Sequence, residues 1–418
     1  MRPVYSGSTG CWRGVRRAGI PVRNGAPPAV PPVVTISPNH TPSETRIPPD
    51  PPGNVKVSVF GSTDVGRTRE HNEDAFLVAD LTTGDTTLIP EVREHVTGER
   101  GTLFMVADGM GGAAAGELAS SMAVDVVMKE LRERWCTDAV PADATNFASA
   151  LRAATEAANE RIHAYATAHP ENRGMGTTAT VAGLLRDTLF LAQVGDSRAY
   201  LVRDGVARQL TKDQSLMQKL LEAGEITEEE AETSDRRNII LQALGPEPSI
   251  RIDLTHQPLR RGDTLVLCSD GLSGQMRAED IAQMAVQEPD LPRLSQALID
   301  KANATGGPDN ITVVVARFDG EGLEESRSSD EVGHQVYAIE GEPPPEPDDF
   351  DKYMHMVRTG PTPISSIREA MAASERAART VRAPRLPEPR ESKRAYVLVA
   401  VFAALIALAY LAVTRWLV

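Results

Sequence analysis

Hydrophobic and polar positions follow two different periods along the middle of the chain. Apolar residues recur at helical spacing in 113–135 and in 146–168, which predicts two amphipathic helices. Residues 177–205 instead alternate apolar and small side chains between short turns, as antiparallel strands do. Further strands are predicted at the short apolar runs 55–60, 75–80, 103–107, 265–268 and 309–318, with two more helices between 277 and 303. Strands in clusters and helices in pairs indicate one α+β domain over residues 55–318.

This pattern is lost on both sides of that region. Residues 1–54 are basic at first and then rich in proline. Such a segment buries too little apolar surface to fold into an ordered structure. Residues 319–394 turn acidic and then proline-rich, which predicts a linker. Residues 395–414 carry no charge over 20 positions, which is long enough for a transmembrane helix. Basic residues are frequent before this span and only Arg415 follows it, which predicts a single-pass C-terminal membrane anchor with the domain in the cytoplasm.

Charge and cysteine content narrow the class of protein. The 418-residue chain has a net charge of -14, which argues against a nucleic-acid binder because such a protein needs a basic face. Its three cysteines, Cys11, Cys136 and Cys268, are scattered and form no CxxC pair. Neither a zinc site nor a disulfide framework is therefore indicated, and a reducing compartment is the simple interpretation.

Acidic residues recur where predicted strands begin or end. The buried run 103–107 is expected to end at Asp108, which a glycine-rich turn follows. One such Asp is usually a turn or cap residue. Here five segments repeat the arrangement, with Glu73 and Asp74, Asp108, Asp196, Asp270 and Asp309. Oxygen ligands without nearby Cys or His favour Mg²⁺ or Mn²⁺. So many carboxylates predict two ions that share a bridging carboxylate and activate water for attack on phosphorus.

A phosphoryl substrate also needs a cation for its non-bridging oxygens. Arg69 lies beside the Glu73–Asp74 pair in the sequence, and an arginine can bind phosphate with two parallel hydrogen bonds. Arg67 is the competing candidate.

Six short segments together resemble a known family. They are TDVGRTREHNEDAF, ADGMGG, GTTAT, VGDSRAYLVRDG, CSDGL and DNITVVV, and their order is that of the metal-dependent protein phosphatases, the type 2C or PPM family. Residues 211–245 also resemble the flap segment of bacterial members. The resemblance covers about residues 55–318. It implies an α-β-β-α sandwich, in which two antiparallel sheets are flanked by helix pairs, and serine/threonine phosphatase activity.

The resemblance also implies a dinuclear Mn²⁺ or Mg²⁺ centre. Asp108 matches the carboxylate that bridges both ions, and Gly109 matches the residue whose carbonyl oxygen binds one of them. Asp270 and Asp309 match ligands of the other ion. The family's nucleophile is a hydroxide bridging the two ions, so no phosphoenzyme is expected.

Glu73, Asp74 and Arg69, which precede the Asp108 strand in the sequence, complete the implied site. Glu73 and Asp74 match carboxylates that hold the metal or its waters, and Arg69 matches the arginine that binds phosphate.

Two positions depart from the family pattern. Met110 stands where some members have a histidine that protonates the leaving alkoxide, so that proton must come from a bound water or another group; nearby His71 is interpreted as a surface residue. Gly274 stands where many members have an aspartate that joins the match of Asp196 at a third metal site. Asp196 is therefore expected to bind a third ion weakly. Gly274 is also expected to adopt a backbone conformation that a side chain would resist.

The leading interpretation is an enzyme that dephosphorylates phosphoserine and phosphothreonine on proteins in signalling. A membrane-anchored serine/threonine kinase fits as a partner, because co-tethering raises effective concentration. Two alternatives remain open: a non-catalytic membrane-tethered relative that binds phosphoproteins, and a dinuclear hydrolase of small phosphate esters. The full set of candidate metal ligands favours activity.

Overall fold

The computed structural model describes residues 54–84, 93–234 and 236–339. All of them belong to the second of two compact units, Pro51–Val418. The N-terminal segment up to residue 53, most of the expected linker and the expected span 395–414 lie outside these residues. Within the described ranges, no helix combines the length and the apolar character needed to cross a membrane.

Two antiparallel sheets form the centre of the domain. The first has the order β3 (Arg93–Val96), β1 (Lys56–Asp64), β12 (Ile311–Asp319), β11 (Thr264–Cys268), β8 (Arg198–Arg203) and β9 (Val206–Gln209). The second has the order β10 (Asp253–Pro258), β7 (Thr188–Val194), β6 (Ala179–Leu185), β4 (Thr102–Met110) and β2 (Asp74–Asp80), and β5 (Gly176–Thr177) pairs with β4.

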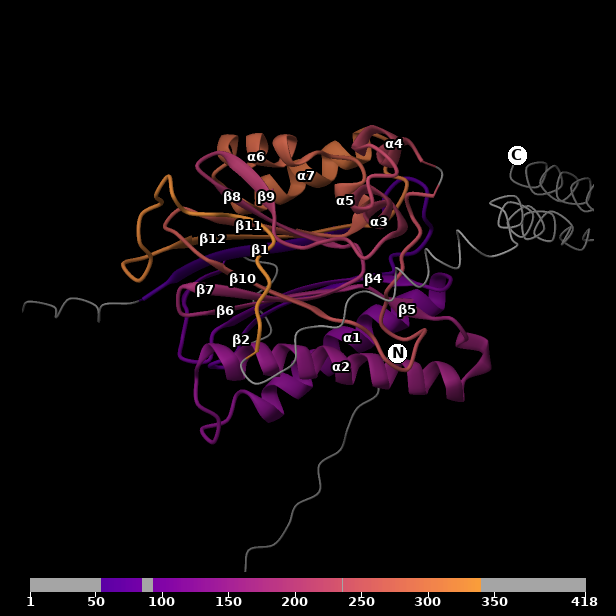
Figure 1. Cartoon of the computed structure of the whole chain (residues 1–418), viewed down its shortest axis with the longest axis horizontal. Coiled ribbons are helices and arrows are strands. Elements are labelled where there is room, and N and C mark those ends of the chain that lie inside the picture. The colour runs from indigo at the N-terminus through magenta and orange to yellow at the C-terminus, as the bar shows by residue number, and fades with distance from the viewer. Residues whose placement is uncertain (1–53, 85–92, 235, 340–418) are drawn as a thin grey trace, which may run out of the picture. The chain divides into compact units, whose positions relative to one another are not determined.

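Helix pairs cover the outer faces of both sheets. α1 (Ala113–Arg134) and α2 (Ala144–Ala168) pack on the second sheet. α6 (Ala278–Gln287) and α7 (Leu291–Ala304) pack on the first (Figure 1). The short helices α3 (Leu216–Glu222), α4 (Glu228–Thr233) and α5 (Asp270–Ser273) lie at one end of the sheets, and a 3₁₀ turn, η1 (Pro170–Asn172), follows α2. The expected α-β-β-α sandwich is confirmed.

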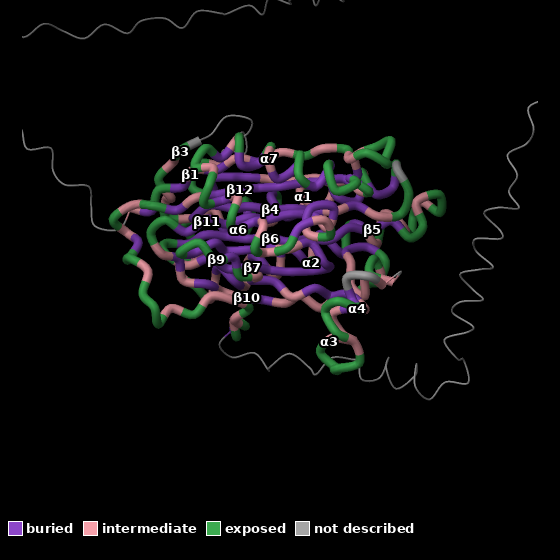
Figure 2. Tube along the Cα trace, turned by 90° about the horizontal axis from the view of Figure 1, so that it is seen from above, coloured by how far each residue is buried: buried purple, intermediate pink, exposed green. Residues whose placement is uncertain are grey.

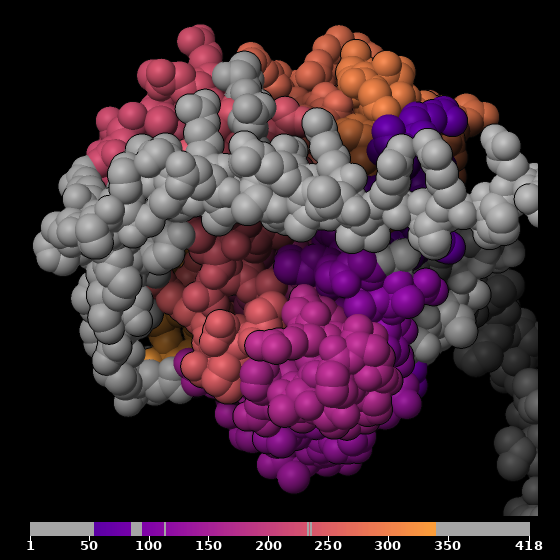
Figure 3. All heavy atoms as spheres, turned by 90° about the vertical axis from the view of Figure 1, so that its right-hand side faces the viewer, coloured from indigo at the N-terminus to yellow at the C-terminus, as the bar shows by residue number. Residues whose placement is uncertain are grey.

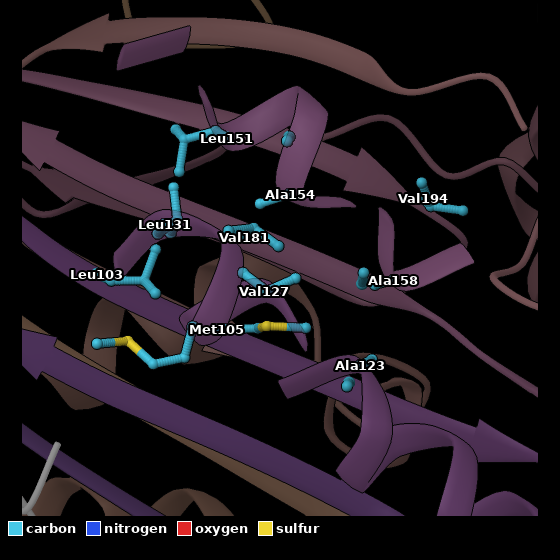
Figure 4. Close-up of a cluster of buried hydrophobic side chains, with 14 of the residues drawn as sticks. Leu103, Met105, Ala123, Val127, Leu131, Leu151, Ala154, Ala158, Val181 and Val194 are labelled. Carbon is cyan, nitrogen blue, oxygen red and sulfur yellow. The ribbon is translucent and has the colours of Figure 1, made fainter. Parts of the chain in front are cut away.

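Three buried apolar layers hold this arrangement together, and burial follows the strands and the inner helix faces (Figure 2). Phe104 and Phe318 meet edge to face between the two sheets. Figure 4 shows the layer between the second sheet and its helices, which includes Leu103, Met105, Ala123, Val127, Leu131, Leu151, Ala154, Ala158, Val181 and Val194. The helix residues among them, Ala123, Val127 and Leu131 of α1 and Leu151, Ala154 and Ala158 of α2, repeat at helical spacing, which is why the pattern of 113–135 and 146–168 predicted both helices.

The end of β4 differs from the expectation. The sequence predicted that this strand ends at Asp108, but β4 continues to Met110. It continues because Gly109 and Met110 pair with Thr177 and Gly176 of β5. Asp108 therefore lies inside a paired strand, which restricts its backbone more than a turn would.

Residues 320–339 pack against the domain, whereas the sequence predicted a linker from residue 319. Leu323 is buried between the sheets. Tyr337 donates its backbone N–H to Leu254 O at 2.9 Å, and its ring packs edge to face on Phe190. Ile339 joins the apolar layer beside α2. Leu323 stands alone in an acidic segment and the apolar run 336–339 is only four residues long, so average composition concealed them.

Candidate active site

Strand pairing within the two sheets brings together four of the five carboxylate-bearing segments. The fifth segment, which carries Asp196, is the turn that connects the two sheets. Asp74 lies opposite Asp108 in the β2–β4 register. Asp270 begins α5 two residues after the end of β11, and Asp309 lies two residues before β12. Asp196 occupies the turn between β7 and β8. Figure 3 faces this end of the domain, with the magenta residues of α2 at the bottom and the red and orange segments at the top.

The electrostatic coupling of these side chains shows that they form one cluster. Burial raises the pKa of Asp108 well above its ordinary value. Neighbouring negative charges raise it further, those of Asp74, Asp270, Asp196 and Asp309. The structure therefore brings all five of these sequence-predicted aspartates together.

Three of the aspartates carry a buried oxygen without a hydrogen-bond partner among the described residues. These oxygens are Oδ1 of Asp74, of Asp196 and of Asp270. Burial, reinforced by repulsion between neighbouring carboxylates, raises the pKa of Asp74 to about 7, of Asp196 to about 8 and of Asp270 to about 6. Buried, unpaired oxygens that repel one another are stabilised by a cation, so the cluster fits a cation site.

The arrangement fits hydrated Mg²⁺ or Mn²⁺ better than a fully protein-coordinated ion. Across the part of the chain that the structure describes, no group of three His, Cys, Asp or Glu side chains is placed to hold one ion. Mg²⁺ usually keeps several waters among its ligands, so some of these carboxylates can hold an ion through water instead of binding it directly.

Asp108 and Gly109 are held by hydrogen bonds from the neighbouring strands. Asp108 N donates to Thr178 Oγ1 at 2.9 Å, and Asp108 O accepts from Thr177 Oγ1 at 2.9 Å. Gly109 N donates to Glu73 O at 3.1 Å, and a side chain at position 109 would collide with the carbonyl oxygens of Glu73 and Gly116. Only glycine fits here, which agrees with a backbone that must approach another group closely.

Arg69 is the arginine that faces the cluster. Its Nη2 lies 2.7 Å from Asp309 Oδ2, and the side chain is 48% exposed, which leaves donors free for a ligand. Burial opposes its charge, but Asp309 and Glu73 together raise the pKa of Arg69. Glu73 is buried, and burial raises its pKa because it also disfavours the charged carboxylate. Arg67 instead contacts the Gly307 loop through its backbone N–H, at 2.7 Å from Gly307 O.

Asn310 organises the Arg69 loop, and the sequence reasoning missed it. Its Nδ2 donates to Val65 O and to His71 O, both at 2.9 Å. Its Oδ1 accepts from Glu73 N at 2.8 Å. One buried amide thus holds both ends of the loop that carries Arg69. The available signal was an amide placed directly after Asp309.

Ser269 is a second contributor that was not predicted. The buried Ser269 Oγ donates to Asp74 Oδ2 at 2.8 Å and accepts from Thr312 N at 2.9 Å. It therefore orients the Asp74 carboxylate from the strand end next to Asp270.

The two departures from the family pattern have different structural outcomes. Met110 ends β4, and His71 is exposed, as expected. The expectation about the Gly274 backbone was wrong: φ is −74° and ψ is −11°, which any residue adopts. A Cβ at Gly274 would lie 2.8 Å from the backbone oxygen Asp270 O, so an added side chain requires the backbone to shift.

An α-β-β-α sandwich with buried carboxylates and an arginine at one end of its sheets defines the class of metal-dependent phosphatases. A sequence model described as Protein phosphatase 2C matches residues 91–307. The chain therefore belongs to the protein phosphatase 2C family, and it is an enzyme of the serine/threonine phosphatase type.

Individual relatives agree with this assignment. The serine/threonine phosphatase stp of Listeria monocytogenes is 37% identical over 257 residues, which cover 62% of this chain and 94% of the relative. The S. agalactiae serine/threonine phosphatase structure has a TM-score of 0.55 and 32% identity, and the match covers 62% of this chain and 99% of that one. The catalytic domain of the phosphatase PstP, solved with two manganese ions, has a TM-score of 0.52 and 34% identity, and the match covers 64% of this chain and all of that one.

Proposed function

We propose that this enzyme hydrolyses phosphoserine and phosphothreonine on proteins with two Mn²⁺ or Mg²⁺ ions held by the carboxylate cluster. One observation carries the proposal. Aspartates from five separate segments converge beside Arg69, and three of them have buried oxygens without partners in the described chain.

The ligand assignment is the one that the family resemblance implies, and the surroundings of Asp108 support it. We assign Asp108 as the carboxylate shared by both ions, because charges of the other segments surround it. The Gly109 carbonyl is assigned to one ion, and Asp270 and Asp309 to the other. When bound, the ions supply an activated water for attack on phosphorus and neutralise the charge of the phosphoryl group.

The remaining candidate ligands are Glu73, Asp74 and Asp196. We assign Glu73 and Asp74 to the metals or their waters, since Ser269 already orients Asp74. Asp196 is assigned to a weakly held third ion, because Gly274 provides no second carboxylate there.

The chain's own groups bind and orient the phosphoryl group. The exposed donors of Arg69 fork onto two phosphoryl oxygens, and the Asn310 amide keeps the Arg69 loop in place for this contact. Met110 has no proton to give to the leaving alkoxide, so that proton comes from a bound water or another group. Because the attacking atom also comes from water, no phosphorylated side chain forms.

Phosphate release from phosphopeptides by the full chain, with and without Mn²⁺, tests this function. We expect activity that requires Mn²⁺, is lost with EDTA, and is abolished by Asp270→Asn or Asp309→Asn. Asp319→Asn is a matched control, because Asp319 ends β12 with an exposed side chain at the opposite end of that strand from Asp309. Near-normal turnover by Asp270→Asn at saturating Mn²⁺ would contradict the metal assignment.

The same assay separates the alternatives. A folded wild-type chain that binds phosphopeptides without turning them over would support the non-catalytic relative. Turnover of small phosphate esters but of no phosphopeptide would support the hydrolase of small esters.

We also propose that residues 395–414 anchor the enzyme in a membrane with its domain in the cytoplasm, close to a membrane-anchored serine/threonine kinase. The support is the run of 20 uncharged residues and the basic residues before it. Fractionation of cells that express the full chain, or a chain that stops at residue 394, tests the anchor. Recovery of the full chain in the soluble fraction would contradict it.

A further inference from the structure

The loop that leads from α2 into β5 carries an exposed arginine, Arg173. We call residues 170–175 the Arg173 loop. It begins with η1, and two backbone hydrogen bonds close it: Arg173 N donates to Pro170 O at 3.2 Å, and Met175 N donates to Asn172 O at 3.0 Å. Gly174 has φ of +85°, so the chain turns sharply directly after Arg173.

The Arg173 loop is fixed against the end of β4. Directly after the loop, Gly176 pairs with Met110. A Cβ at Gly111 would lie 2.9 Å from Met175 Cα and 3.1 Å from Gly174 O, so backbone touches backbone at this point. The buried Met175 side chain also joins the apolar layer between the second sheet and its helices. The loop is therefore a fixed part of the rim around the carboxylate cluster, on the side of α2, which lies at the bottom of Figure 3.

These contacts give the distance from Arg173 to the cluster. Gly174 meets Gly111, which follows Asp108 by three positions, so Arg173 lies three to four positions beyond Asp108 along the direction of β4. At about 3.4 Å for each position, the separation is about 10–14 Å. A phosphopeptide bound in an extended form advances by about the same length for each residue. Arg173 therefore lies within reach of a substrate side chain about three to five positions from the phosphorylated residue.

The guanidinium of Arg173 is free to bind a ligand. Within the described ranges it makes no hydrogen bond and no ion pair. Other arginines near the cluster are paired, Arg69 with Asp309 at 2.7 Å and Arg198 with Asp213 at 2.7 Å. The five N–H donors of a free guanidinium form a rigid fork that matches a carboxylate.

The surroundings make an acidic substrate side chain the favoured partner. The whole chain has a net charge of -14, so most of its surface repels acidic peptides and a free arginine on the rim is a local exception. Glu171 of η1 is exposed as well, but no ion pair joins it to Arg173. The guanidinium therefore stays open to a carboxylate from the substrate, which it can bind with two parallel hydrogen bonds.

We propose that Arg173 is a specificity-determining residue, which favours phosphoprotein substrates that carry Asp or Glu about three to five positions from the phosphorylated serine or threonine. The contact lies outside the reacting centre, so it strengthens the binding of substrate and transition state alike. It should therefore lower KM and leave kcat unchanged. The proposal rests on the proposed function, because it places a phosphopeptide at the carboxylate cluster.

Steady-state kinetics with a matched set of phosphopeptides tests this role. Each peptide has one phosphothreonine in a neutral sequence, and a single Glu, Gln or Lys is placed in turn at each position up to five on either side. The full chain is assayed with saturating Mn²⁺ at low ionic strength, where exposed charges are least screened. In the wild type, Glu at a position three to five residues away should raise kcat/KM over Gln about 1.5- to 5-fold, as expected for an exposed ion pair, and Lys should lower it.

Two substitutions make the test specific to Arg173. Arg173→Gln should remove the difference between the Glu and Gln peptides, and Arg173→Glu should reverse the order so that Lys is preferred. Arg161→Gln is the matched control, because Arg161 is also an exposed arginine of α2's C-terminal half but lies roughly 10 Å before the end of that helix. It should keep the wild-type preference. Thermal denaturation should show equal stability for all these variants, since both arginine side chains are exposed.

Loss of the preference in Arg173→Gln together with its reversal in Arg173→Glu supports the inference. A preference that persists in Arg173→Gln, or that disappears equally in Arg161→Gln, would overturn it, as would a preference expressed in kcat alone. Equal turnover of all peptides by the wild type would overturn the role of Arg173 and leave the proposed function standing. A wild type that hydrolyses none of the phosphopeptides would overturn the proposed function and this inference together.

Discussion

Replacing Asn310 by alanine should destabilise the domain and weaken substrate binding at the same time. The substitution removes three side-chain hydrogen bonds, to Val65 O, His71 O and Glu73 N. At about 0.5–1.5 kcal/mol each, the free energy of unfolding should fall by roughly 1.5–4.5 kcal/mol. Because the loop between these groups carries Arg69, the KM for a phosphopeptide should rise toward the value of an Arg69 variant.

Asn303→Ala is the control for this prediction. Asn303 is also buried and lies in the same part of the chain, but its amide makes one such bond, to Asp64 Oδ1 at 3.0 Å. Its cost should be only about 0.5–1.5 kcal/mol, with an unchanged KM. Urea denaturation at fixed Mn²⁺ gives both free energies, and steady-state kinetics give KM and kcat. If the two variants lose equal stability and keep equal KM, Asn310 does not organise the Arg69 loop.

Three further predictions use the same protein. Arg69→Ala should raise KM about ten- to a hundredfold through loss of a charge-assisted contact, and Arg67→Ala should change it little; the reverse ranking in phosphopeptide kinetics would transfer the role to Arg67. Burial raises the pKa of Asp74 to about 7 and of Asp196 to about 8, so the folded state keeps protons that the unfolded state releases. The stability of the EDTA-treated protein should therefore fall as the pH rises from about 4 to about 8. Denaturation across this range checks the sign, Mn²⁺ should remove the slope, and stability that rises with pH would refute it. Calorimetry should find two tight Mn²⁺ sites and a weak third. Gly274→Asp should strengthen the third site once the backbone has moved to relieve the 2.8 Å approach of the new Cβ to Asp270 O, and three equally tight sites in the wild type would show that other groups complete the third site.

Local patterns in the sequence determined much of the architecture and the chemistry. The helices at 113–134 and 144–168 were predictable because their apolar residues repeat with the helical period, which needs no knowledge of the partner sheet. The candidate ligands were recognisable because each carboxylate stands next to a predicted strand. Five repeats of one local arrangement indicated a metal site before any contact was known.

The tertiary structure decided which distant residues support that site. Asn310 contacts Val65 across 245 positions of the chain. Gln214 contacts Gly195, and the residues around neither of them in the sequence predict this contact. The short edge strands β3 and β10 and the packing of residues 320–339 were also hidden, because each depends on the strand or core that it meets. Periodicity reports only how a segment divides between core and solvent. Hydrogen-bond partners of single buried amides are chosen when sheets and loops pack, so they can be identified only in the folded domain.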